Sequence, residues 1–129
     1  MAHEIRQLDL ALDSPARPCI AVLGGIKVDD SIEVALNMLN NAIADEVWLT
    51  GGVANLAIHL SGHDIGEGNV EFLRNELKDA WEPTVDSAKS LLSTYADKIV
   101  LPIDVAANVE GNRIDLKVEK LPIHAPLFD

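Results

Sequence analysis

The sequence contains a single cysteine, Cys19, so no disulfide bond can form within the chain. A lone cysteine is typical of proteins of a reducing compartment, and we interpret this one, inside an apolar run, as a small buried core residue. Aromatic residues make up only 4% of the chain, although hydrophobic residues reach 48%. The core must therefore consist mainly of Val, Ile, Leu and Ala, and the composition excludes a disordered chain.

The sequence also has no long hydrophobic run and no excess of positive charge. No apolar stretch approaches the ~20 residues of a membrane-spanning helix, and residues 1–4 have neither the basic nor the apolar region of a signal peptide. Lys and Arg number 10 against 21 Asp and Glu, which gives a net charge of −11. Because nucleic acids and anionic lipids recruit Lys and Arg, we expect no nucleic acid and no membrane as partner, and a cytoplasmic location.

The two common glycine-rich nucleotide motifs are missing, since the sequence has no GxGxxG and no GxxxxGK[ST]. It also has no Ser–His–Asp or Cys–His arrangement with usable spacing. What it does have is an alternation of apolar runs of strand length with amphipathic helical stretches, in a chain of 129 residues that suits one domain. Strands that alternate with helices imply parallel pairing with right-handed crossovers.

The predicted fold class is α/β: a three-layer, Rossmann-like, mostly parallel sheet with flanking helices and a carboxyl-terminal β-hairpin, as in part of a nucleotide-binding domain. We expect helices at 4–12, from 30, at 53–60, from 69 and from 83, strands at 19–23, 46–50 and 98–104, and hairpin strands at 104–109 and 113–118. The continuously apolar strand at 19–23 should be covered on both faces. Residues 121–129 show no clear element.

Single residues predict several helix starts. Asp30 with Glu33 three positions later is typical of a capping box, Asn69 suits a helix cap, and Pro83 suits a first helical turn. A parallel sheet of three strands is thin and leaves its edges open. We therefore expect the chain to form a homo-oligomer through exposed sheet edges.

Two glycine pairs, Gly24-Gly25 and Gly51-Gly52, each follow a predicted strand, and Lys27 lies between the first pair and the next helix. Glycine lets a ligand approach the backbone, and a helix N-terminus attracts anions. Ligands of open α/β sheets bind at the carboxyl ends of strands, so this pattern favours a nucleotide phosphate site. Tight turns also need glycine and a lone lysine is usually solvated, so purely structural roles stay open.

Other polar residues give weaker indications of chemistry. His59 and His63 are spaced to share a metal on one helix, but no third ligand is evident, so a solvated helix end is the preferred interpretation. Asp29 and Asp30 suit Mg²⁺ with a nucleotide, although a capping role for Asp30 needs no metal. Further candidates, each with surface charge as the simpler reading, are Glu67 and Asp104. We assign no metal-binding residues.

Several segments, in this order, resemble phosphoglycerate kinase over nearly the whole chain. RPCIAVLGGIKVDDSIEV closely resembles the family's RPxxxxLGGAKVxD segment. WLTGGVANLAIHLSGHDIG resembles its second glycine motif, and KIVLPIDVAAN resembles its LPVD strand. EIRQLDLALDSPARP is similar to the helix and linker that join the family's two domains, and VDDS and TGGVAN resemble the archaeal members.

The resemblance implies part of an enzyme that transfers a phosphoryl group between 1,3-bisphosphoglycerate and ADP, with ATP or ADP and Mg²⁺ as cofactors. It implies that residues 1–16 form the interdomain helix and linker, and that residues 17–129 form a partial nucleotide-binding domain. The nucleotide-binding residues it implies are Gly24, Gly25, Lys27, Gly51 and Gly52. The catalytic residues it implies are Lys27, at the nucleotide or the transferring phosphate, and Asp30.

Two departures from the family pattern limit what the chain should do. Ser31 occupies the position where many bacterial and eukaryotic members carry a second lysine. The phosphoglycerate-binding domain and the later glycine-rich motifs have no counterpart in this sequence. We therefore expect the chain alone to be inactive, to bind nucleotide at most weakly, and to meet 3-phosphoglycerate only within the full enzyme. The alternative is a stand-alone α/β nucleotide-binding or protein-interaction module.

Overall fold

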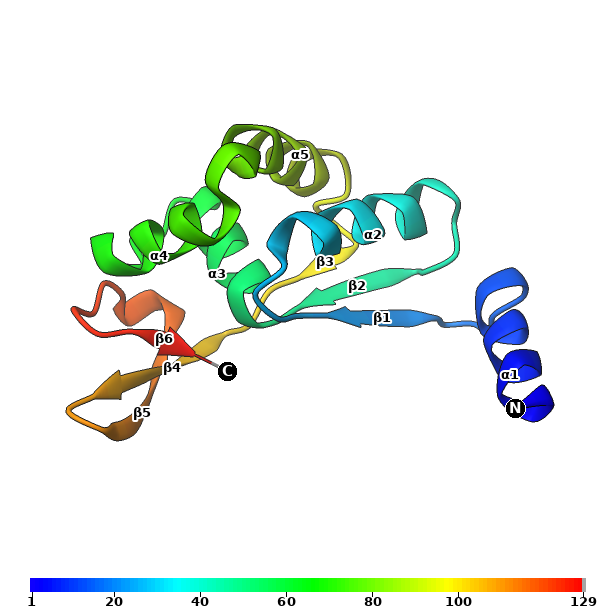
Figure 1. The fold of residues 1–129 in the computed structure, drawn as a ribbon, viewed down its shortest axis with the longest axis horizontal. Helices are drawn as coiled ribbons and strands as arrows, with labels where there is room; N and C mark the ends of the chain where they lie inside the picture. Colours follow the sequence, from blue (N-terminus) through cyan, green and yellow to red (C-terminus); the bar gives the residue numbers. More distant parts are fainter. Residues whose placement is uncertain (129) are drawn as a thin grey trace.

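The computed structural model describes residues 1–128, except for the side chain of Leu12. Helices and strands alternate over residues 2–60, after which further helices are followed by the remaining strands (Figure 1). The helices are α1 (Ala2–Asp13), α2 (Val28–Asn40), α3 (Gly51–Leu60), α4 (Glu67–Leu77) and α5 (Trp81–Thr94), with short 3-10 turns at Lys78–Ala80 and Val118–Lys120. The strands are β1 (Ile20–Leu23), β2 (Glu46–Leu49), β3 (Ile99–Val100), β4 (Asp104–Val109), β5 (Asn112–Lys117) and β6 (Leu127–Phe128).

These strands form two small sheets. The first is parallel, with β2 between β1 and β3, and the second is antiparallel, with β4 between β5 and β6. The predicted α/β class, with its parallel sheet, flanking helices and carboxyl-terminal hairpin, is confirmed. Among residues 1–128, none of the helices is both long and apolar enough to cross a membrane.

The core lies between the parallel sheet and the helices above it. Helix α2 buries one stripe of residues, Val28, Ile32, Ala35 and Leu39, at the spacing of an amphipathic helix. Helix α3 is almost wholly buried between α2, α4 and α5, and β2 contributes buried side chains to the same cluster. The core is aliphatic, as the low aromatic content predicts.

The opposite face of the parallel sheet is uncovered within residues 1–128. Ile20, Val22, Trp48 and Val100 are 44%, 62%, 43% and 38% exposed, and three of them form one row, because Val22 pairs with Trp48 and Trp48 with Val100. Helices α2 to α5 all lie on the other side of the sheet (Figure 1). The described chain thus supplies two of the three expected layers, and the expectation that residues 19–23 are covered on both faces is wrong.

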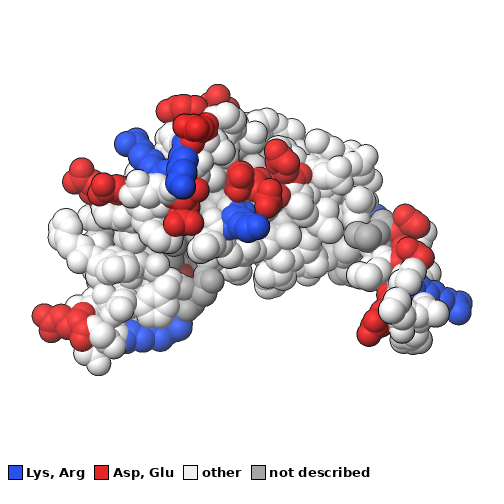
Figure 2. All heavy atoms as spheres, in the orientation of Figure 1, with Lys and Arg blue, Asp and Glu red and all other residues white. Residues whose placement is uncertain are grey.

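Charge follows the same division of the surface. Acidic side chains gather over α4 and α5 and around α1, whereas the lower edge of the view along β1 is free of them (Figure 2). Helix α1 precedes β1 and projects from its amino end, away from the other helices (Figure 1). Its apolar residues Ile5, Leu8 and Leu10 are at least half exposed.

Two predicted helix caps are wrong. Helix α2 begins at Val28 with Lys27 at the N-cap, and no side chain caps it, so Asp30 and Glu33 form no capping box. The cause is packing, because Val28 is fully buried and draws the helix start into the core. Helix α4 begins at Glu67, which places Asn69 inside the helix, where its side chain bonds other segments. Pro83 does lie in the first turn of α5, as predicted.

Two strand predictions also differ from the structure. The expected strand at 98–104 is reduced to Ile99–Val100, because Pro102 cannot donate a ladder hydrogen bond and the chain leaves the sheet there. The hairpin is confirmed, with Glu110 and Gly111 both at positive φ in the turn. The tail, for which no element was expected, supplies β6 and pairs with β4.

A polar cluster fixes the entry to β1. Asp45 accepts a hydrogen bond from the Cys19 N–H at 2.6 Å and pairs with Arg17 at 3.0 Å. Arg17 also donates to the carbonyls of Ala42 and Ile43. Cys19 itself is half-buried at the start of the strand, so the expectation that it lies buried in the core is wrong. The cluster joins the segment after α1 to the turn between α2 and β2.

We expect Asp45 to stabilise the fold in a pH-dependent way. The Cys19 N–H, followed by Arg17, lowers the pKa of Asp45 from its usual 3.8. The contribution of Asp45 to the free energy of unfolding should be fully present above pH 3.8 and lost as the pH falls through the lower pKa of the folded state. Asp45→Asn should therefore lower the urea midpoint at pH 7, and the difference from wild type should shrink below about pH 4. Asp86→Asn on α5 is the control; an equal loss in both variants, or a gap independent of pH, would contradict the prediction.

Candidate functional site

The two glycine pairs meet at the carboxyl ends of β1 and β2. The strands run parallel in register, and the Thr50 N–H donates to the Leu23 carbonyl at 2.8 Å just where both end. A Cβ at Gly52 would lie 2.9 Å from the Gly25 carbonyl oxygen. The second pair therefore packs directly on the backbone of the first.

The glycines differ in what surrounds them. A Cβ at Gly24 would overlap the Thr50 hydroxyl, so Gly24 and Gly52 have an internal packing reason to be glycine. Gly25 has φ +100° and no other residue within 4 Å of the place its Cβ would take, so it faces open space. Gly51 also has positive φ, at 58°, at the start of α3. The backbone a ligand could approach most freely is that of Gly25.

A small cavity of about 190 Å³ lies beside these glycines. Its lining includes Gly25, Gly51 and Gly52 from the junctions, and Gly24 lies beside it without lining it. The rest of the lining is mostly apolar and comes from the residues next to these junctions, from α4 and from the tail: Ile26, Asn55, Asn69, Phe72, Leu73, Leu127 and Phe128. Small-molecule sites usually measure about 300 Å³ or more, so this cavity alone is smaller than an ordinary ligand site.

Lys27 and the N-termini of α2 and α3 follow the glycine pairs along the chain and place positive charge near the cavity, which Lys27 itself does not line. Lys27 is exposed at the N-cap of α2, and none of the acidic side chains described in residues 1–128 pairs with it. No side chain caps α2 or α3. The Val28 N–H donates to the Ile26 carbonyl at 2.9 Å, so at α2 only the N–H groups that follow it could meet an anion. Apolar walls beside uncapped helix ends and a lysine suit a flat ring that carries phosphates.

Asp30 lies apart from this cavity. It is exposed in the first turn of α2 and borders a shallow groove with Glu33, Val34 and Asn37 along the outer side of the helix. Its negative charge in the first turn interacts favourably with the positive end of the helix dipole. Ser31 is half-buried in the same turn.

The remaining candidates lie near other hollows. Glu67 borders a cavity of about 630 Å³ between α4 and the tail, and Asp104 borders one of about 510 Å³ between α3 and the hairpin, which it shares with Gly51. His59 lies in the last turn of α3 and His63 beyond its end. No group of three His, Cys, Asp or Glu side chains within residues 1–128 is placed to hold a metal ion.

Seven lining residues were not predicted as site residues by the sequence analysis: Ile26, Asn55, Asn69, Phe72, Leu73, Leu127 and Phe128. Asn55 follows Gly51 by four positions, so the helical period was a usable signal for it. Leu127 and Phe128 gave no such signal, because they reach the glycines only through the pairing of β6 with β4. Phe72 reaches them through the packing of α4 on α3.

Comparisons with known proteins identify the family to which the chain is similar. The sequence profile of the family "Phosphoglycerate kinase" matches residues 1–129. The phosphoglycerate kinase of Methanothermobacter thermautotrophicus is 42% identical over 129 residues, which are 100% of this chain and 30% of that protein. That of Thermoplasma acidophilum is 42% identical over 113 residues, or 88% of this chain and 27% of that protein.

Solved structures give the same result. The crystal structure of phosphoglycerate kinase from Pyrococcus horikoshii matches with a TM-score of 0.87 and 33% identity, covering 100% of this chain and 32% of that one. Phosphoglycerate kinase from Coxiella burnetii matches with a TM-score of 0.74 and 26% identity, over 99% of this chain. The chain thus spans about 30% of the length of the curated relatives it matches. Because the family profile matches every residue of the sequence, this chain belongs to the phosphoglycerate kinase family.

Proposed function

We propose that this chain forms one wall of the nucleotide site of an enzyme that transfers a phosphoryl group between 1,3-bisphosphoglycerate and ADP. The observation that carries this proposal is the cavity at the two strand ends, where Gly25, Gly51 and Gly52 meet apolar side chains beside uncapped helix termini. The ring would lie against Phe72, Leu127 and Phe128. The phosphates would lie toward Lys27, whose fixed charge suits a reaction that depends on positioning and charge stabilisation.

We also propose a division of the chain into a connector and a partial domain. Residues 1–16 would join the nucleotide-binding part, residues 17–129, to the domain that holds 3-phosphoglycerate. The exposed apolar side chains of α1 support this, because they suit a helix that packs against a further segment. Mg²⁺ would arrive bound to the nucleotide, and the net charge of −11 argues against nucleic acid or anionic lipid as partner and fits a cytoplasmic protein.

The 129-residue chain alone should bind ADP more weakly than about 1 µM and should show no phosphoryl transfer, because its cavity is small and the acceptor site is absent from it. Lys27→Met should weaken ADP binding about tenfold, since a hydrogen bond to a charged group contributes about 1.5–3 kcal/mol. Calorimetric or NMR titration with Mg·ADP measures both.

Lys89→Met on the outer side of α5 is the matched control and should bind as wild type does. If Lys27→Met and wild type bind ADP with equal affinity, Lys27 does not take part in nucleotide binding. Submicromolar affinity would contradict the partial pocket, and measurable turnover would contradict the inactivity.

We further propose that the isolated chain self-associates through the uncovered sheet. Ile20, Val22, Trp48 and Val100 form a contiguous apolar surface that we name the open sheet face, and β1 leaves an unpaired edge beside it. A second copy packing sheet on sheet would exclude water from both faces. The net charge of −11 opposes this association, so added salt should favour it.

A further inference from the structure

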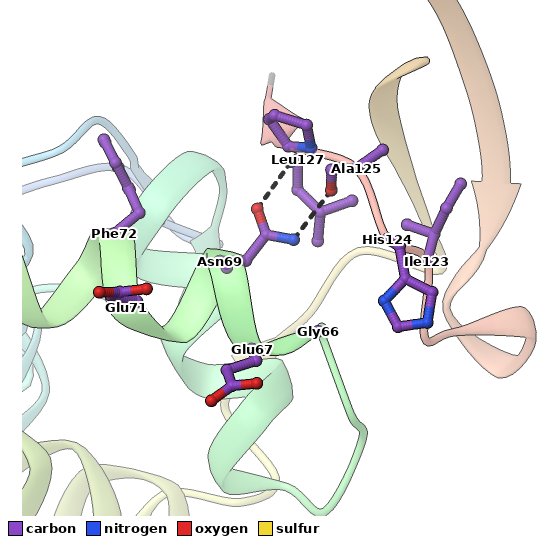
Figure 3. Close-up of a pocket in the computed structure, with 11 residues that line it drawn as sticks. Gly66, Glu67, Asn69, Glu71, Phe72, Ile123, His124, Ala125 and Leu127 are labelled. Carbon is purple, nitrogen blue, oxygen red and sulfur yellow. Dashed lines mark hydrogen bonds between the residues drawn. The ribbon is translucent and has the colours of Figure 1, made fainter. Parts of the chain in front are cut away.

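The tail of the chain is held to α4 by the side chain of Asn69. Its Nδ2 donates to the Ala125 carbonyl at 3.0 Å and to the Ile65 carbonyl at 2.8 Å. Its Oδ1 accepts from the Leu127 N–H at 2.9 Å. Figure 3 shows the amide pointing from α4 toward the tail, with both tail contacts drawn. The half-buried Asn69 amide thus uses its donor and its acceptor on two different backbone groups of the tail. Such a contact fixes the position of the tail more specifically than a surface contact would.

The tail makes few other hydrogen bonds, although Leu127 packs against the core and the Arg113 guanidinium lies over the Phe128 ring. Pro122 and Pro126 supply no backbone N–H, and β6 pairs with β4 over only two residue pairs. The Pro126 carbonyl accepts from the Asn108 N–H at 2.9 Å. On the α4 side, a Cβ at Gly66 would lie 2.9 Å from the Ile123 carbonyl oxygen, so the tail runs against the helix start. Asn69 therefore makes the two hydrogen bonds that join the tail to α4.

The clamped segment is also one wall of the glycine cavity. Leu127 and Phe128 line that cavity together with the junction glycines, and Asn69 lines it as well. The Leu127 N–H donates directly to Oδ1 of Asn69, so any loosening of the clamp moves this wall.

We propose that Asn69 is a positioning residue for nucleotide binding: it fixes the tail on α4 and so sets the distance between the apolar wall and the glycines. This inference rests on the proposed nucleotide site, which it deepens. In this role Asn69 acts through Leu127 and Phe128, and the ordered wall precedes binding, because pre-organised groups cost less to immobilise.

The test compares Asn69→Ala with Asn75→Ala, an exposed asparagine of the same helix. Amide hydrogen exchange of Leu127 and Mg·ADP titration by NMR are measured on each 129-residue variant under folding conditions. Asn69→Ala should speed exchange of the Leu127 amide and weaken ADP binding, each about tenfold, because two hydrogen bonds are lost. Exchange in β2 should stay unchanged, and Asn75→Ala should match wild type in both measurements. Asn69→Asp keeps the acceptor for the Leu127 N–H, so its Leu127 exchange rate and its ADP affinity should lie between those of wild type and Asn69→Ala. This variant replaces Asn69→Ala in the test if Asn69→Ala does not fold.

The outcomes separate this inference from the proposed site. If wild type binds ADP and Asn69→Ala binds it equally well, the positioning role is overturned while the nucleotide site stands. Unchanged Leu127 exchange in Asn69→Ala overturns the clamp. If wild type binds no ADP at all, the nucleotide site fails and the positioning role with it, and faster exchange then shows a purely structural clamp.

Discussion

Gly52→Ala should lower the free energy of unfolding by about 1–3 kcal/mol, the usual cost of overpacking a close contact. The new Cβ would lie 2.9 Å from the Gly25 carbonyl oxygen and 3.4 Å from Cγ2 of Val28. The carbonyl belongs to the backbone and Val28 is fully buried, so neither can rotate away. The carboxyl ends of β1 and β2 would have to separate, which also widens the glycine cavity.

Gly68→Ala provides the matched control, because no atom lies within 4 Å of its added Cβ. It lies in α4, where alanine is the better helix former, so stability should be unchanged or higher by up to about 1 kcal/mol. Urea unfolding followed by circular dichroism measures both variants. Equal stability of Gly52→Ala and wild type would show that the two junctions pack less tightly than the distances indicate. Gly24→Ala should cost less than Gly52→Ala, because a turn of the Thr50 side chain relieves its contact.

Val22→Lys should convert a self-associating chain into a monomer at micromolar concentration. Val22 is 62% exposed on the open sheet face, so the substitution leaves the core intact. A second copy would have to bury the lysine charge against apolar side chains, and an unpaired charge in such a contact is strongly unfavourable. Sedimentation velocity across a concentration series measures the change. The fluorescence of Trp48 on the same face should shift with concentration in wild type only.

Val34→Lys is the control, because it places the same charge on the outer side of α2, where valine is 44% exposed. It should associate as wild type does. A monomeric wild-type chain at all concentrations would sink the self-association proposal, and loss of association in Val34→Lys as well would point to net charge instead of the open sheet face.

Local patterns in the sequence predicted most of the fold. The parallel strands, the apolar stripe of α2 and the hairpin all follow from short-range spacing, which residues close in sequence determine. The three residues expected between the hairpin strands, 110–112, are reduced to Glu110 and Gly111, because Asn112 pairs with Val109. The errors occurred where distant packing prevailed. Val28 extends α2 into the core and removes the capping role of Asp30, and Asn69 bonds the tail instead of capping α4.

The candidate site divides in the same way. The positions of Gly25, Gly51 and Lys27 after strands were visible in the sequence, because glycine and charge at a strand end form a local pattern. The contact between Gly52 and the Gly25 carbonyl was not, since it depends on the register of β1 against β2. The outlying position of Asp30 likewise depends on which side of α2 faces the core.

By itself the sequence determined the family, the pattern of strands and helices, and the glycines at two strand ends. Each of these features depends on residues that are neighbours along the chain. Only the tertiary structure decided that the tail forms one wall of the cavity, that Asn69 holds it there, and that one face of the sheet lies open. These features join segments more than 50 residues apart, such as Asn69 and Leu127, whose separation is 58. Contacts at that range are selected by packing of the whole chain, which no local spacing specifies.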